Sequence, residues 1–115
     1  MPVVPAAAPM KDVVYEMSRK RFGITAVVEG SGRLAGVVSD GDLRRLLERH
    51  GSQAMDLSAG DAMSRNPRTI AASAFATEAL LEMEEKKITS VFVVDAEGRP
   101  AGILHLHDLW GIESI

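Results

Sequence analysis

The chain contains no cysteine, and this absence excludes several kinds of site at once. Without thiolates there is no disulfide, no cysteine nucleophile and no zinc site built on sulfur. Aromatic residues make up only 4% of the 115 residues, and the apolar runs are far shorter than the roughly 20 residues of a membrane span. The first residues lack the basic and apolar regions of a secretory signal. These absences predict a cytoplasmic protein.

An excess of positive charge is also missing. The net charge is −3, which predicts no general affinity for nucleic acid or for anionic membrane surfaces. Apolar residues account for 46% of the chain and charged residues for 25%, which is ordinary for a folded globular protein. A chain of 115 residues has room for one compact domain or for two closely packed half-domains.

What the chain does contain is an internal repeat. Shifting the sequence by 66 positions gives a match without gaps from Val3 to about Leu47. One register is kept through predicted helix, turn and strand, which indicates a duplication. The clearest pairs are Glu16-Met17 with Glu82-Met83, Val27-Val28 with Val93-Val94, Gly32-Arg33 with Gly98-Arg99, Ala35-Gly36 with Ala101-Gly102, and Asp42-Leu43 with Asp108-Leu109.

The repeat divides the chain into a first copy, residues 1–57, and a second copy, residues 58–115. The second copy opens with Ser58–Met63, which has the Ser-x-x-Asp pattern of a capped short helix. Its counterpart in the first copy would precede residue 1, so we expect the chain to have been cut from a longer polypeptide. Each copy is short for a stable domain, and the two are therefore expected to share one core.

The pattern predicts an α/β (α+β) fold in which each copy runs strand–helix–strand–strand–helix, with the copies packed about a pseudo-twofold axis. Met10, Val13, Val14 and Met17 have the spacing of a buried helical stripe. Glycine turns separate the two apolar strands of each hairpin. In the first copy the expected elements are strands at 3–4, 26–28 and 35–38, helices over 10–17 and from Leu43 to His50, and a linker at 52–57.

The segment from Gly36 to Leu43 is the most informative for function. A strand ends at Ser39, and Asp42 follows three positions later at a helix start. One interpretation is a capping box, in which Ser39 and Asp42 satisfy backbone N–H groups. The other is a ligand site, in which the helix N-terminus and hydroxyl hold a phosphate and Asp42 accepts hydrogen bonds from a ribose diol.

The second copy has histidines at the corresponding place. On a strand, His105 and His107 share one face, and with Asp108 they form a candidate metal-binding set. No further histidine or cysteine completes that set nearby, so we expect no metal. The alternatives are a polar face that hydrogen-bonds an anionic ligand, and simple surface exposure. No Ser–His–Asp set and no paired-carboxylate cleft argues for catalysis.

The duplicated pattern Val27-Val28-Glu29, Gly32-Arg33 and Gly36-Val37-Val38-Ser39-x-x-Asp42-Leu43 resembles a tandem pair of CBS (cystathionine β-synthase-type) motifs. The resemblance implies a module that binds nucleotides, commonly adenylates, with Ser39 at the phosphate and Asp42 at the ribose. In the second copy Asp108 matches, whereas His105 replaces the serine or threonine. The remaining candidates that the resemblance implies are Val4, Pro5, Ile24, Thr25, Ala26, Asp40 and Thr69, and Arg68 is the best cationic candidate for a phosphate.

A narrower resemblance concerns Pro5–Val13, Ser39–Arg45, Arg65–Ile70 and His105–Leu109. These segments are similar to the C-terminal CBS pair of bacterial D-arabinose 5-phosphate isomerases. In those enzymes an N-terminal sugar-isomerase domain makes arabinose 5-phosphate for the synthesis of Kdo, an acidic sugar of lipopolysaccharide. The resemblance implies regulation of that enzyme, with CMP-Kdo or AMP, ADP or ATP as the ligand and the CBS pair as a homodimer. The other two hypotheses are a ligand-free dimerisation module and a metal-dependent enzyme that uses His105, His107 and Asp108.

Overall fold

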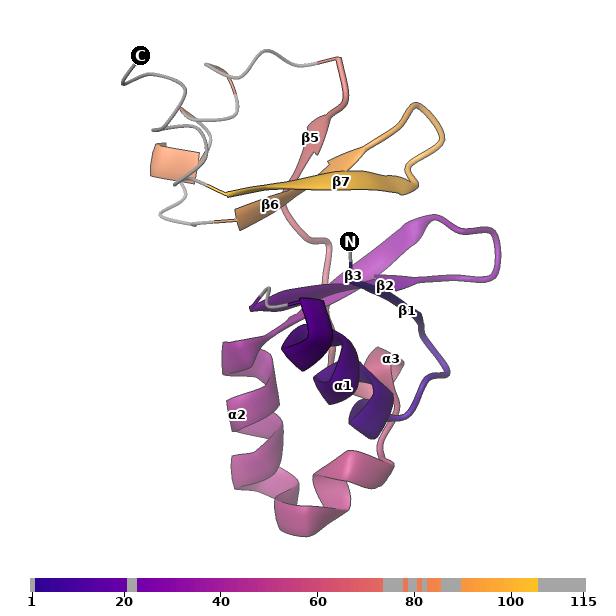
Figure 1. Cartoon of the computed structure of the whole chain (residues 1–115), viewed down its shortest axis with the longest axis vertical. Helices are drawn as coiled ribbons and strands as arrows, with labels where there is room; N and C mark the ends of the chain where they lie inside the picture. Colours follow the sequence, from indigo (N-terminus) through magenta and orange to yellow (C-terminus); the bar gives the residue numbers. More distant parts are fainter. Residues whose placement is uncertain are drawn as a thin grey trace. The chain divides into compact units, whose positions relative to one another are not determined.

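The chain folds into two compact units, Met1–Pro67 and Arg68–Ile115, each with its own β-sheet (Figure 1). The computed structural model describes residues 2–20, 23–73, 78, 81, 83–85 and 90–105. Mixed helix and strand confirm the predicted α/β class, while the packing of the two copies about a twofold axis stays a prediction. The elements are β1 (Val3–Pro5), α1 (Met10–Lys20), β2 (Ile24–Val28), β3 (Leu34–Ser39), α2 (Asp40–His50), η1 (Gly51–Asp56), α3 (Ala59–Ala62), β4 (Ser64–Arg65), β5 (Thr69–Ala71), β6 (Ser90–Val94) and β7 (Pro100–His105).

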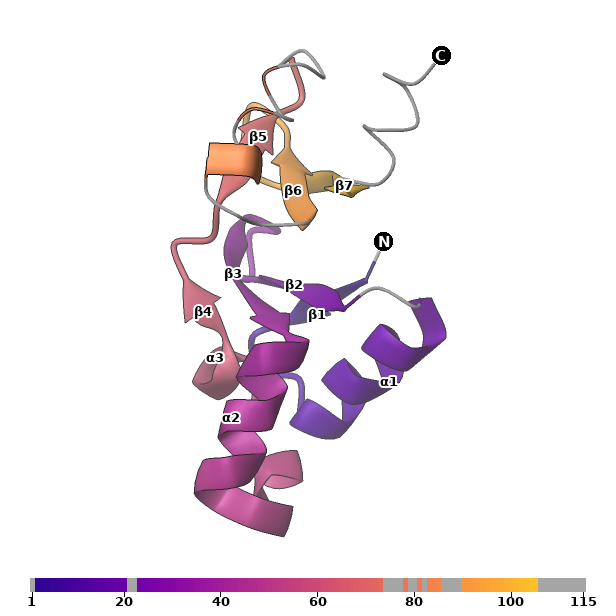
Figure 2. The same ribbon diagram turned by 90° about the vertical axis from the view of Figure 1, so that its left-hand side faces the viewer.

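Unit 1 is a four-stranded sheet, in the order β1-β2-β3-β4, with α1 and α2 on one face (Figure 2). Strand β1 runs parallel to β2, while β2, β3 and β4 are antiparallel neighbours. The predicted helical stripe is confirmed, because Met10, Val13 and Met17 are buried in the core. They pack with apolar side chains of the sheet, including Val4, Val27 and Val38.

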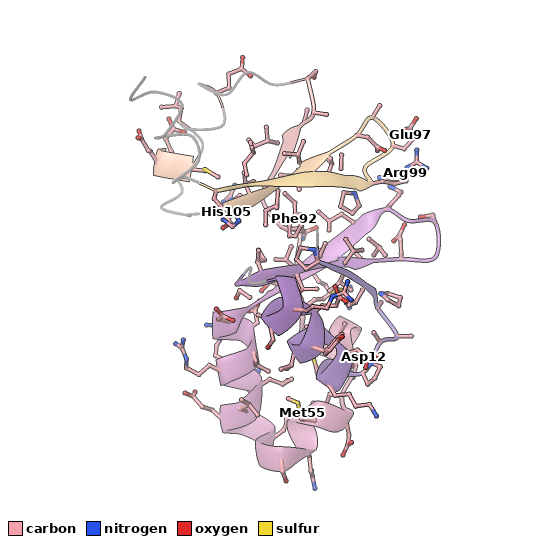
Figure 3. All side chains as sticks on the ribbon, in the orientation of Figure 1. Asp12, Met55, Phe92, Glu97, Arg99 and His105 are labelled. Atoms are coloured by element: carbon pink, nitrogen blue, oxygen red, sulfur yellow. The ribbon has the colours of Figure 1, made fainter. Side chains whose placement is uncertain are left out.

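The predicted hairpins are confirmed in both copies. Gly32 has a φ of 88° and Gly98 a φ of 80°, a backbone conformation that glycine adopts without steric cost. The register shifts between Val27 and Val28, and between Val93 and Val94, so the two hairpins share the same irregularity 66 positions apart. At the second turn Arg99 pairs with Asp95 at 3.2 Å and with Glu97 at 3.4 Å. Figure 3 shows Arg99 and Glu97 at this turn.

The segment predicted to link the copies is folded. The expected linker at 52–57 is largely the 3₁₀ helix η1, whose Ala54 is wholly buried and packs in the core of unit 1. The predicted capped helix is confirmed as α3, where Ser58 and Asp61 form a capping box. Together with β4, which pairs with β3, α3 belongs to unit 1, so this unit extends to Pro67.

In unit 2 the described strands form a three-stranded sheet in the order β5-β6-β7. Strand β5 is parallel to β6, and β6 is antiparallel to β7, as in the first three strands of unit 1. Val91, Phe92 and Met83 are buried. Residues 78, 81 and 83–85 are helical, in agreement with the predicted helix, and the helix predicted to follow β7 lies outside the described residues.

Candidate functional site

Ser39 ends β3 and caps the N-terminus of α2, an 11-residue helix. The Asp42 N–H donates to Ser39 Oγ at 3.2 Å, and the Ser39 N–H donates to Asp42 Oδ2 at 2.9 Å. The Ser39 hydroxyl also donates to Oδ2, at 3.0 Å. The capping-box interpretation is therefore confirmed, and the same geometry places a hydroxyl and a carboxylate beside the positive end of a helix.

The other carboxylate oxygen of Asp42 is held by two further side chains. Ser64 Oγ donates to Oδ1 at 2.9 Å, and Arg45 Nη2 donates to it at 2.7 Å. The Asp42 side chain is only 8% exposed. Burial acts to raise the pKa of its carboxyl, but the hydrogen bonds from Ser39, Arg45 and Ser64 outweigh burial and lower the pKa below the ordinary 3.8. Asp42 is therefore an anion near neutral pH.

A cavity of about 220 Å³ opens beside these contacts. Its volume is below the ~300–1,000 Å³ of most small-molecule pockets, so it suits part of a ligand, such as a sugar ring. The pairing of Arg45 with Asp42 was not predicted from the sequence, although their i, i+3 spacing on a helix is a usable signal. The lining residues are Asp42, Arg45, Leu46, Arg49, Asp61, Ala62, Met63 and Ser64.

The predicted site residues of the first copy divide between the two faces of the sheet. Ile24 pairs with Ser39 in the β2–β3 ladder, so these two residues share the face opposite the helices. Because side chains alternate between the two faces along a strand, Ala26 and Pro5 lie on that face as well. Val4 lies on the other face, in the helix-packed core. Asp40 is exposed, and its N–H donates to the Gly23 carbonyl at 3.0 Å.

A larger cavity, of about 440 Å³, lies between β1 and α1. Val4 and Pro5 contribute to its wall, so these two predicted residues line a different cavity from the one beside Asp42. Its full lining is Val3, Val4, Pro5, Ala7, Ala8, Asp12, Tyr15 and Glu16.

Thr25 is wholly buried, and its hydroxyl is the one buried side-chain polar group among the described residues without a hydrogen-bond partner. It pairs with Val38 of the core, so it lies on the helix-covered face. An unsatisfied buried hydroxyl destabilises a fold, because it loses its hydrogen bonds to water and gains none. The position therefore favours an apolar side chain of the same shape.

Thr25→Val is accordingly expected to raise the free energy of unfolding by about 1 kcal/mol. Urea unfolding followed by circular dichroism measures the change. Thr25→Ser is the matched control: it keeps the hydroxyl, removes a buried methyl group and is expected to lower stability. A loss of stability in Thr25→Val would show that the hydroxyl has a partner in solution.

In unit 2, His105 ends β7 and pairs with Ser90 of β6. Ser90 Oγ and His105 Nδ1 lie 2.8 Å apart, a hydrogen bond that orients the half-buried imidazole. Figure 3 shows His105 at the end of its strand, with Phe92 on the neighbouring strand. Thr69 pairs with Phe92, so the register puts Thr69 and His105 on the same sheet face. Arg68 is exposed just before β5.

The remaining residues predicted for this copy, His107 and Asp108, lie outside the described residues. Within the described ranges no three histidine, cysteine or acidic side chains are grouped closely enough to hold a metal ion. The His-x-His set that the sequence raised as a metal site thus stays untested. In the part of the chain that the structure describes, no helix has the length and apolar character needed to cross a membrane.

Comparison with known proteins identifies the two copies. The profile of the CBS domain matches residues 1–49 and again residues 59–109. Arabinose 5-phosphate isomerase KdsD of Pseudomonas aeruginosa is 40% identical over 109 residues, which are 95% of this chain and 33% of that protein. KdsD of Escherichia coli K12 is 35% identical over the same length. The chain thus spans about a third of these curated relatives.

Solved structures agree with the profile. CBSX2 of Arabidopsis thaliana, in complex with AMP, has a TM-score of 0.84 and 27% identity, covering 99% of this chain and 87% of that one. The CBS domain protein PAE2072 of Pyrobaculum aerophilum, complexed with AMP, has a TM-score of 0.82 at 22% identity, covering 99% and 92%, which shows a shared fold. The chain belongs to the CBS domain family and carries two copies of the domain.

Proposed function

We propose that this chain is a regulatory module that binds a nucleotide or nucleotide sugar and controls a D-arabinose 5-phosphate isomerase in the cytoplasm. The observation that carries the proposal is the pairing of Ser39 with an ionised Asp42 at the N-terminus of α2. A hydroxyl and a helix end suit a phosphate, and a carboxylate suits a ribose diol. In this proposal the chain itself performs no catalysis, and a sugar-isomerase domain of the whole protein is its partner.

The relatives support both parts of the proposal. The KdsD proteins are named as arabinose 5-phosphate isomerases, and they are about three times as long as the matched region. CBSX2, at 27% identity, is a CBS pair crystallised with AMP. An adenine nucleotide is therefore one candidate ligand for this module.

The other candidate is CMP-Kdo, the activated acidic sugar. It offers a ribose to Asp42, and a phosphate to Ser39 and the helix end. The hydrogen bond between Ser90 Oγ and His105 Nδ1 orients the ring of His105, at the position that corresponds to Ser39 in the first copy. In the second copy an imidazole thus stands where the first copy has a hydroxyl, and imidazole is a group that can hydrogen-bond an acidic ligand.

Isothermal titration of this chain with CMP-Kdo, AMP and ATP tests the proposal. Ser39→Ala is expected to weaken binding about tenfold, because it removes one charge-assisted hydrogen bond from the hydroxyl to the phosphate. Ser58→Ala, which removes the equivalent cap from α3, is the control and should bind as the wild type does. If the chain binds AMP but not CMP-Kdo, CMP-Kdo is not its ligand. If it binds none of the three nucleotides, the proposed nucleotide binding is wrong and dimerisation is the better function.

A separate observation supports dimerisation. Tyr15 on α1 is 61% exposed, and Leu81, 66 positions later in the helical part of the second copy, is 57% exposed. Large apolar side chains at equivalent positions in both copies suit an interface in which the module pairs with a second copy of itself. We therefore propose a homodimer that uses these two helices, with or without a bound nucleotide.

The double variant Tyr15→Glu, Leu81→Glu is expected to raise the dimer dissociation constant at least a hundredfold, since charge at the centre of an apolar interface is costly. Analytical ultracentrifugation over a concentration series measures it. The control Ser73→Glu adds charge at an exposed site outside both helices and should leave association unchanged. Equal dissociation constants for all three proteins would rule out this interface.

A further inference from the structure

The two carboxylate oxygens of Asp42 have different roles. Oδ2 accepts the N–H and the hydroxyl of Ser39 and so completes the cap of α2. Oδ1 accepts from Ser64 and Arg45. Ser64 is 22 residues away along the chain and belongs to β4, the last element of unit 1. One carboxylate thus joins the proposed ligand site to the segment that leads into unit 2.

We propose that the hydrogen bond from Ser64 to Asp42 is a latch that a ligand diol opens. A ligand that binds Asp42 displaces Ser64 from Oδ1 and thereby releases β4 from β3. This inference rests on the proposed nucleotide binding and adds the residue that competes with the nucleotide for its carboxylate.

Oδ1 is the oxygen that a ligand can take. Release of Oδ2 would break the cap of α2, whereas release of Oδ1 disturbs only two side chains. Of these, Arg45 is 62% exposed and can turn into solvent. The cavity of about 220 Å³ is lined by Asp42, Arg45 and Ser64, so a sugar hydroxyl reaches Oδ1 from that side.

Strand β4 is held weakly enough for one hydrogen bond to matter. It has two residues, and it pairs with β3 only at Gly36–Arg65 and Val37–Ser64. A hydrogen bond to an ionised group is roughly twice as strong as a neutral one, so the Ser64–Asp42 contact is a large part of what fixes β4. Unit 1 ends at Pro67, directly after this strand, so release of β4 lengthens the free connection to unit 2.

The test combines AMP titration with hydrogen exchange over residues 63–67, on the wild type and on Ser64→Ala. Without nucleotide, Ser64→Ala should exchange about tenfold faster in this segment. It should also bind AMP about five- to tenfold more tightly, because the competitor for Oδ1 is gone. In the wild type AMP should speed exchange over residues 63–67, and in Ser64→Ala it should add no further change. Ser31→Ala, in the exposed turn between β2 and β3 and bonded, among the described residues, only to the nearby Glu29 and Arg33, is the control and should match the wild type in both measurements.

The outcomes separate the latch from the proposed function. Equal or weaker AMP binding by Ser64→Ala, or unchanged exchange in the free variant, overturns the latch while nucleotide binding stands. If Ser64→Ala binds AMP and the wild type does not, the result supports a latch that holds the site closed. If neither protein binds AMP, CMP-Kdo or ATP, the nucleotide proposal fails, and unchanged exchange in Ser64→Ala then shows separately that Ser64 does not hold β4.

Discussion

Replacing Asp42 with alanine is expected to lower the free energy of unfolding by about 3 kcal/mol, because the loss combines a helix cap with charge-assisted hydrogen bonds. The carboxylate has four donor contacts, from the N–H and hydroxyl of Ser39, from Ser64 and from Arg45. Its removal leaves the half-buried Ser39 N–H without this partner and takes away the contact that ties β4 to α2. Urea unfolding followed by circular dichroism measures the loss.

Asp61→Ala is the matched control for this variant. Asp61 has the same capping-box geometry, with Ser58, but at the start of the four-residue helix α3 and in an exposed position. Its loss should destabilise the chain much less than the loss of Asp42. Equal effects of the two substitutions would mean that the contacts of Asp42 to Ser64 and Arg45 contribute nothing to stability.

The stabilisation by Asp42 should depend on pH. The folded state lowers the pKa of its carboxyl below 3.8, despite burial, through hydrogen bonds from Ser39, Arg45 and Ser64. A group whose pKa is lower in the folded than in the unfolded state stabilises the fold fully above the unfolded pKa, and this contribution is lost as pH falls through the folded pKa. The difference in stability between wild type and Asp42→Asn should therefore be constant above about pH 5 and shrink below pH 4. A difference that stays constant down to pH 2 would contradict the lowered pKa.

The parts of the fold that were predicted correctly depend on neighbours in sequence. The capping box needs only Ser39 and Asp42, which are three positions apart and leave little choice of geometry. The turns at Gly32 and Gly98 follow from the conformational freedom of glycine between two apolar runs. The helical stripe from Met10 to Met17 follows from the spacing of its apolar residues alone, which matches the period of an α-helix.

The parts that were missed depend on residues far apart. No local pattern in the sequence predicts the hydrogen bond between Ser64 and Asp42, which are 22 residues apart. The repeat shows which residues of the two copies are equivalent, but it does not show that the segment between them packs with unit 1. Within the predicted group Ile24, Thr25 and Ala26, successive side chains point to opposite faces of the sheet, which spacing along the chain alone does not assign. The register with β3 decides that Thr25 lies on the core face.

Gly36→Ala is expected to lower the free energy of unfolding by about 2–3 kcal/mol, through overpacking. A Cβ at this position would lie 2.7 Å from Met63 Sδ and 2.7 Å from the Ser64 carbonyl oxygen. The sulfur belongs to a flexible side chain, but the carbonyl is part of the backbone of β4, so relief requires β4 to move away from β3. Urea unfolding gives the energy, and hydrogen exchange over residues 63–67 shows whether β4 is the part displaced.

The repeat supplies the control in the same chain. Gly102 is the equivalent of Gly36 in the second copy, and no described atom lies within 4 Å of a Cβ built there. Alanine loses less conformational freedom than glycine on folding, so Gly102→Ala should leave stability unchanged or raise it by up to about 1 kcal/mol. If Gly36→Ala were as stable as the wild type, β4 would not pack against β3 in solution. If Gly102→Ala lost as much as Gly36→Ala, both copies would have a covered strand edge, and the difference between the two units would disappear.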